Sequence, residues 1–195
     1  MRRPHRLLLA ATAASLLLGA CAPLSPQIRH SGAAQQRQQA AAFELEGRLS
    51  ASDGERAASG RMEWLHSPTR DSWTLLNPLG QIAAQLEQDA SGAELVTADG
   101  RRYRAGSADS LLPQLLGVEV PVARLAQWVQ AAPRREAEIR ETDGSGRPTL
   151  LIDAGWRIAY LEYADNGINA APRLMDISRG DTRLRLFIDR WTPTP

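Results

Sequence analysis

The sequence has 195 residues, 43% of them hydrophobic, which suits one domain with a sizeable core and room for a tail. A formal net charge of +1 leaves no broad basic face for nucleic acid. The single cysteine, Cys21, excludes an internal disulfide and a cysteine-based metal cluster.

The N-terminus has the pattern of a secretory signal peptide. Residues 1–20 begin with arginines, continue with a short apolar run and end on small residues before Cys21. The Leu-Gly-Ala-Cys segment at 18–21 resembles the bacterial lipobox, which implies that Cys21 becomes the new N-terminus and carries an N-acyl diacylglyceryl anchor. Ala22 replaces the aspartate that marks inner-membrane retention in such lipoproteins, so we expect a lipid anchor in the outer membrane and a domain facing the periplasm. The alternative is an ordinary signal peptide that is cut before a cysteine.

Residues 21–42 are predicted to link this anchor to a folded domain at 43–195. Two prolines and no periodicity over 22–26 indicate an irregular tether. The Gln- and Ala-rich stretch 35–42 has two interpretations, a short polar helix leading into the domain or a disordered continuation of the tether.

From Phe43 onward, apolar residues alternate with polar ones, which is the period of a half-buried strand. The pattern recurs along the first half of the domain, and an Asp-Gly turn at 99–100 predicts a hairpin there. The predicted strands of this antiparallel meander cover residues 43–50, 61–66, 72–76, 81–87, 93–97 and 102–104.

One predicted turn, Asn77-Pro78-Leu79-Gly80, carries a leucine that the turn itself does not need. Pro78 presets φ and Gly80 supplies a permissive backbone, so the chain can reverse whatever stands between them. Leu79 is therefore either an exposed apolar tip with a function or a side chain that folds back against its own hairpin.

The middle of the chain changes to helical spacing. Ser107 is expected to cap a short helix that Gly117 stops, and Pro113 limits where that helix can begin. Pro121 opens a second helix that ends before Pro133. Further strands are predicted at 137–141, 149–152, 156–163, 173–178 and 182–191. The expected fold is mainly β, a curled antiparallel sheet of ten or eleven strands whose concave side is covered by two or three helices.

No catalytic motif is apparent. The sequence lacks Gly-x-Ser-x-Gly, His-Glu-x-x-His and a phosphate-binding glycine loop followed by lysine. His66 is the only histidine in the predicted domain, and its position at a strand end favours a structural role. Glu44, Glu46 and Glu162 are explained as solvated positions by the alternation. We therefore predict no enzyme, no catalytic residue, no cofactor and no metal site.

Short motifs spread along the whole chain resemble the LolB family of outer-membrane lipoprotein receptors. One segment departs from the family pattern, because residues 130–133 read Gln-Ala-Ala-Pro where the family often has glycine before proline. The motifs that carry the resemblance are the lipobox, Phe43-x-x-x-Gly47-Arg48-Leu49, Asn77-Pro78-Leu79-Gly80, Asp99-Gly100-x-x-Tyr103, Leu115-x-Gly117-x-x-x-Pro121 with Trp128, Gly155-Trp156-x-x-x-Tyr160 and Trp191.

The resemblance implies an unclosed antiparallel β-barrel of about eleven strands, with helices forming a lid over a hydrophobic cavity. It also implies a receptor that accepts lipoprotein cargo from a LolA-like periplasmic carrier and releases it into the phospholipid of the outer membrane. No nucleotide motif is present, so we expect transfer to follow graded affinity. We expect a monomer.

Such cargo needs an apolar container, because three acyl chains in water would cost tens of kcal/mol at ~0.8 kcal/mol per CH₂. Candidate wall residues come from the meander, from both helices and from one later strand, and they could instead fill a closed core. They are Trp64, Trp73, Leu75, Leu86, Leu95, Leu112, Leu115, Leu125, Trp128 and Trp156.

By the same resemblance, Pro78, Leu79 and Gly80 form a protruding loop that hands cargo to the membrane. One leucine contributes about 2 kcal/mol on entering an apolar medium, too little to anchor a protein but enough to perturb a bilayer surface.

Two other functions remain open from the residues alone. One is a carrier of another lipid or glycolipid on the same fold, and the other is a structural assembly lipoprotein whose concave face is filled by side chains.

Overall fold

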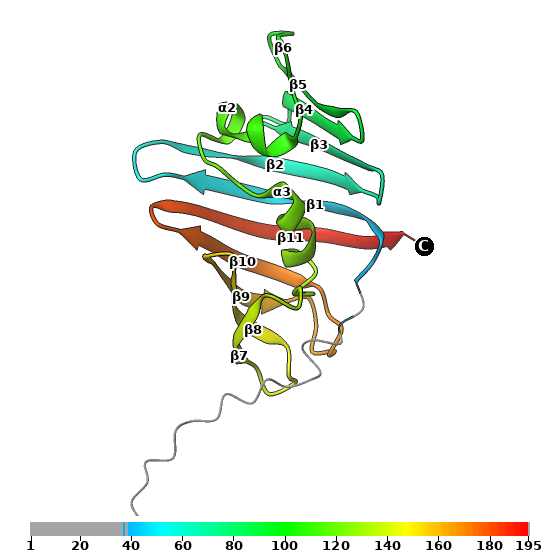
Figure 1. Cartoon of the computed structure of the whole chain (residues 1–195), viewed down its shortest axis with the longest axis vertical. Coiled ribbons are helices and arrows are strands. Elements are labelled where there is room, and N and C mark those ends of the chain that lie inside the picture. Colours follow the sequence, from blue (N-terminus) through cyan, green and yellow to red (C-terminus); the bar gives the residue numbers. More distant parts are fainter. Residues whose placement is uncertain (1–36, 38, 195) are drawn as a thin grey trace, which may run out of the picture.

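The computed structural model describes residue 37 and residues 39–194 (Figure 1). The predicted signal peptide, the predicted lipidation site Cys21 and most of the predicted linker lie outside the described residues. Within them, no helix has the length and apolar character needed to cross a bilayer.

The described chain forms one antiparallel sheet of eleven strands in the order β6-β5-β4-β3-β2-β1-β11-β10-β9-β8-β7. The first strand pairs with the last at the centre, and β6 and β7 form the two edges, so the barrel is unclosed as predicted. The strands are β1 (Ala42–Ser52), β2 (Ala57–His66), β3 (Arg70–Leu76), β4 (Ile82–Asp89), β5 (Gly92–Thr97), β6 (Arg102–Ala105), β7 (Glu138–Thr142), β8 (Pro148–Asp153), β9 (Trp156–Tyr163), β10 (Pro172–Arg179) and β11 (Thr182–Thr194).

The alternation read from the sequence becomes the two faces of this sheet. In β11, Leu184, Leu186 and Ile188 are buried, and in β1 the buried Leu45 and Leu49 lie on the same inner face. Side chains between these positions point to the other side of the sheet, because successive residues of a strand alternate. One face therefore builds the core and the opposite face is largely charged.

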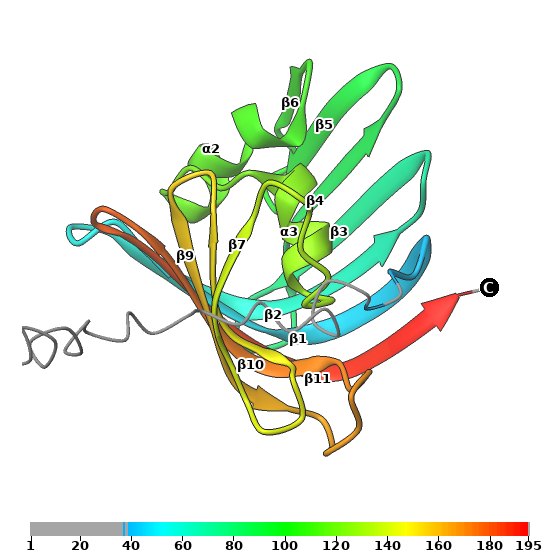
Figure 2. The same cartoon turned by 60° about the horizontal axis from the view of Figure 1, so that its bottom comes forward.

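The helices between β6 and β7 lie in the hollow of the curled sheet (Figure 2). They are a 3₁₀ turn, η1 (Ala108–Ser110), and two short helices, α2 (Leu112–Leu116) and α3 (Val122–Trp128). The first predicted helix is therefore split. Pro113 lies in the first turn of α2, where its missing N–H is tolerated, and η1 precedes it as a separate turn. We call η1, α2 and α3 the lid.

The stretch 35–42 was open to two interpretations. Its described residues before the sheet, Arg37, Gln39, Ala40 and Ala41, belong to no helix, and Ala42 is already the first residue of β1. The polar helix is not found in this described part of the stretch.

Candidate functional site

The candidate wall residues meet where the lid packs on the inner face of the sheet. Six of them project from strands of the sheet. Strand β9 contributes Trp156, and strands β2, β3, β4 and β5 contribute Trp64, Trp73, Leu75, Leu86 and Leu95. The lid contributes Leu112 and Leu115 from α2 and Leu125 and Trp128 from α3. Nine of the ten belong to one buried cluster, and Leu115 packs against it partly exposed. In this state the lid's own side chains occupy the hollow.

A buried carboxylate clasps the lid to the sheet. Asp153, only 3% exposed, accepts hydrogen bonds from Trp128 Nε1 at 2.8 Å and from Arg124 Nη1 at 2.5 Å. The Tyr160 hydroxyl donates to the Trp128 carbonyl at 3.0 Å, and burial raises the pKa of Tyr160 well above its ordinary value. These polar contacts join α3 to β8 and β9.

The sequence signal for this clasp was weak. Asp153 precedes Ala154-Gly155 in a tight hairpin between β8 and β9. This local sequence predicts an ordinary exposed turn. Only the packing of α3 over that hairpin buries the carboxylate and gives it two donors.

A second aromatic group lies at the end of the sheet where β1 begins. Trp64 and Trp73 have ring centroids 5.4 Å apart. Phe43 lies between Trp64, which it meets edge to face at 5.0 Å, and Trp191, whose tilted ring is 4.3 Å away. Asp71 accepts a hydrogen bond from Trp64 Nε1 at 2.8 Å, and His66 Nδ1 lies 2.6 Å from the same carboxylate oxygen. His66 thus has a structural partner at the margin of the apolar wall.

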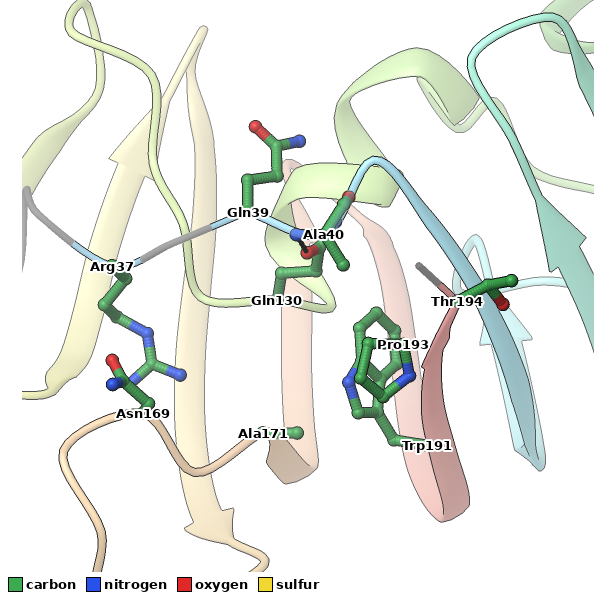
Figure 3. A pocket seen from close by; sticks show the side chains of 9 residues that line it. All are labelled: Arg37, Gln39, Ala40, Gln130, Asn169, Ala171, Trp191, Pro193 and Thr194. Carbon is green, nitrogen blue, oxygen red and sulfur yellow. Dashed lines mark hydrogen bonds between the residues drawn. The ribbon is translucent and has the colours of Figure 1, made fainter.

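A groove of about 470 Å³ opens at the same end (Figure 3). The segment before β1 forms part of its rim, and Gln130, directly after α3, fixes that segment by accepting the Ala40 backbone N–H at 2.7 Å. Arg37 donates to the carbonyls of Ile168 and Ala170 at 2.6 and 2.5 Å. Trp191 lines the groove from β11. The chain from the predicted anchor therefore enters the domain in contact with the end of the lid.

The turn at 77–80 is a stiff protrusion. Asn77 Oδ1 accepts the backbone N–H groups of Leu79 and Gln81 at 2.9 and 3.1 Å, and the Asn77 carbonyl accepts that of Gly80 at 2.9 Å. Gly80 has φ of +80°, which favours glycine. Leu79 is 84% exposed, so its side chain does not fold back against the hairpin. Ile82, at the start of β4, is 50% exposed beside it.

The acidic residues considered from the sequence form no catalytic pair. Glu46 pairs with Arg190, Glu162 lies 3.5 Å from Arg173, and Glu44 is exposed. Within the described residues, no three His, Cys, Asp or Glu side chains are grouped to hold a metal ion.

Comparisons with known proteins agree with this architecture. The family model described as "Outer membrane lipoprotein LolB" matches residues 41–191. An outer-membrane lipoprotein LolB of Azoarcus sp. is 52% identical over 191 residues, covering 97% of each chain, and one of Thiobacillus denitrificans is 37% identical over 91% of this chain and 93% of its own.

Among solved structures, a LolA superfamily protein of Nitrosomonas europaea superposes with a TM-score of 0.52 at 8% identity, covering 84% of this chain and 90% of its own, which shows a shared fold. The family match and the two near-full-length relatives confirm the resemblance read from the motifs. The chain belongs to the LolB family of outer-membrane lipoproteins.

Proposed function

We propose that this protein is the outer-membrane receptor that takes lipoproteins from a LolA-like periplasmic carrier and releases them into the outer membrane without nucleotide. Cys21 would carry the lipid anchor, and the domain would face the periplasm. The observation that carries the proposal is the apolar lid–sheet interface, in which all ten candidate wall residues lie at or in one cluster.

Acyl chains can replace the lid side chains in this interface because the lid helices have little stability of their own. Helices of 5 and 7 residues are marginal in water, so α2 and α3 depend on the apolar contacts they make with the sheet. Acyl chains offer the sheet an equivalent apolar surface, at ~0.8 kcal/mol per buried CH₂. Cargo would thus enter by replacing the lid side chains, once the clasp at Asp153 opens.

Graded affinity supplies the direction of transfer. A carrier, this receptor and a bilayer differ only in how much apolar contact they give the same chains, so each step can run downhill without a covalent reaction. The receptor keeps the chains dry during the step, and the bilayer is the final and strongest holder.

Release is proposed to depend on Leu79. The turn fixed by Asn77 points this leucine into solvent, where it can enter a leaflet and bring the domain to the bilayer. The anchor can reach the same leaflet. The stretch from Cys21 to Arg37 reaches about 55 Å when fully extended. This reach exceeds the length of the longest strand of the domain, because the 13 residues of β11 span about 43 Å.

The test is cargo transfer in a purified system. Carrier-bound lipoprotein is added, without nucleotide, to vesicles that contain the lipidated receptor or none, and vesicle-bound cargo is measured by flotation. The proposal expects cargo to move only to receptor-bearing vesicles. If the carrier keeps its cargo while the receptor binds free glycolipid, the chain is a different lipid carrier, and if neither binds, it is a structural lipoprotein.

A further inference from the structure

The outer face of the sheet carries arginine-lined grooves next to Leu79. One groove, of about 610 Å³, is lined by Arg48, Arg61 and Arg185 together with the whole turn at 77–80. A neighbouring groove of about 580 Å³ shares Arg185 and adds Arg157 and Arg183. The two grooves thus form one continuous surface across β2, β1, β11, β10 and β9, and we call it the arginine face.

The strand register concentrates positive charge on this face. Arg48 of β1 lies directly opposite Arg61 of β2, and both side chains are exposed on the outer face. Like charges in opposite positions of neighbouring strands are destabilising. The positive charge of Arg48 is compensated, because its guanidinium group pairs with Asp189 at 3.0 Å and lies 4.1 Å from the centre of the Phe187 ring. Arg61 forms no ion pair with any described residue.

The acid that lines these grooves is already engaged. Asp176 is the one carboxylate that lines either groove, and it pairs with Arg185 at 2.6 Å. Arg157 and Arg183, like Arg61, have no ion pair within the described part of the chain. Three arginines on this face therefore keep their full capacity to bind an anion.

The arginine face and the apolar tip form a single surface, because Leu79 and Arg61 line the same groove. The base of the turn is fixed against β2. A Cβ on Gly60 would lie 2.4 Å from the Leu76 carbonyl oxygen, so glycine is needed for the two backbones to approach this closely. The headgroup layer of a leaflet is about 5 to 8 Å thick. A leucine that enters the acyl layer therefore places Arg61, which lines the same groove, at the level of the phosphates.

We propose that the arginine face binds the phosphate groups of anionic phospholipids when Leu79 enters the leaflet. Guanidinium groups bind phosphate oxygens bidentately, and an apolar tip bordered by cations suits a membrane surface better than an acidic protein. The proposal rests on the proposed function of Leu79 and adds the lipid class that Arg61, Arg157 and Arg183 recognise. Its consequence is a fixed orientation of the domain on the membrane during release.

The experiment uses the full lipidated chain in vesicles of phosphatidylcholine alone or mixed with phosphatidylglycerol. An environment-sensitive fluorophore at Ile82→Cys, beside the turn, reports entry of the turn into the leaflet. We expect strong entry only with phosphatidylglycerol. One arginine near an anionic surface is worth about a 5-fold change, so Arg61→Gln should weaken entry about 5-fold and Arg61→Gln with Arg183→Gln about 25-fold. Arg61→Lys should retain most of it.

The matched control is Arg135→Gln, an exposed arginine that lines neither groove and forms no ion pair within residues 39–194. It should behave like the unchanged chain. High salt should weaken entry, because exposed charges are screened. Inorganic phosphate should weaken entry more than sodium chloride of the same ionic strength, because it offers the guanidinium groups the same oxygens. Equal entry into both kinds of vesicle, or unchanged entry for the double variant, would overturn the proposal.

Failure of this inference is distinguishable from failure of the proposed function. Leu79→Glu tests the proposed function and should block cargo release into the vesicles that contain phosphatidylglycerol. If Leu79→Glu blocks release while the double arginine variant behaves normally, the receptor role stands and the arginine face has no part in it. If Leu79→Glu releases cargo normally, the role of Leu79 itself is wrong.

Discussion

The indole N–H of Trp128 on the lid donates a 2.8 Å hydrogen bond to Asp153, which belongs to the hairpin at the end of β8. Trp128 also packs against Trp156 with ring centroids 5.8 Å apart. The same lid residue thus forms both an apolar wall contact and a polar contact with the sheet. Opening of the lid over β8 and β9 therefore requires the loss of this clasp.

Replacing Asp153 by alanine should loosen the lid. Trp128 Nε1 and Arg124 would lose their acceptor, and leaving such donors unpaired costs about 3 kcal/mol. Urea denaturation should show this loss, and amide exchange should speed up most in α3. Glu138→Ala is the control, because its ion pair with Arg140 is about half exposed and contributes at most about 1 kcal/mol. Equal effects of the two variants would mean that Asp153 does not hold the lid.

Leu79→Glu should separate receipt of cargo from its release. The exchange removes about 2 kcal/mol of favourable entry into the leaflet, so insertion should slow about 30-fold or more, while acyl chains should still cross-link to the receptor. The melting temperature should not change, because Leu79 is exposed. Leu161→Glu, at another exposed leucine, is the control and should insert cargo normally. Normal insertion by Leu79→Glu would contradict the role.

Gln130→Ala should release the segment that precedes β1. Ala40 would lose the partner of its backbone N–H, and Gln130 also donates to the Ala126 carbonyl at 2.9 Å. We expect a loss of about 1 kcal/mol and about 5-fold faster amide exchange at Ala40. Gln114→Ala, on the exposed side of α2, should leave that exchange unchanged. An unchanged rate in Gln130→Ala would mean that this side chain does not restrain the segment.

Gly60→Ala should distort the base of the Leu79 turn. The added methyl group would lie 2.4 Å from the Leu76 backbone oxygen, so the two paired strands must shift apart, and we expect a loss of about 2 kcal/mol or more in thermal unfolding. Gly144→Ala is the matched change, because a Cβ there meets nothing within 4 Å. A Gly60→Ala protein as stable as Gly144→Ala would refute this close approach.

Stability should fall in acid. Hydrogen bonds from the Thr97 hydroxyl and from Arg101 lower the pKa of Asp99 to about 2 in the folded chain, below its ordinary value of 3.8. The unfolded chain then binds more protons in this window, so the contribution is complete above about pH 5 and is lost as pH falls from about 4 toward 2. Urea midpoints measured across this range should fall in the native chain and less steeply in Asp99→Asn. Parallel curves would show that Asp99 contributes nothing.

Local patterns were enough to predict much of this protein. The alternation from Phe43 to Leu49 and from Leu184 to Ile188 predicts strands with one apolar face, since a strand exposes successive side chains to opposite sides. Proline and glycine at 121 and 117 predict where helices begin and end. The order of short motifs indicated the family, and the fold and the comparisons confirmed it.

Only the tertiary structure decided how these elements meet. Pairing of β1 with β11 joins the two ends of the domain, and no local signal in either strand predicts it. The burial of Asp153 under α3, the contact of Gln130 with Ala40, and the gathering of Arg61, Arg157 and Arg183 on one face join residues far apart in sequence. Periodicity reports which way a side chain points along its own element. The partner it meets depends on how distant elements pack, because burial and charge compensation are properties of the assembled fold.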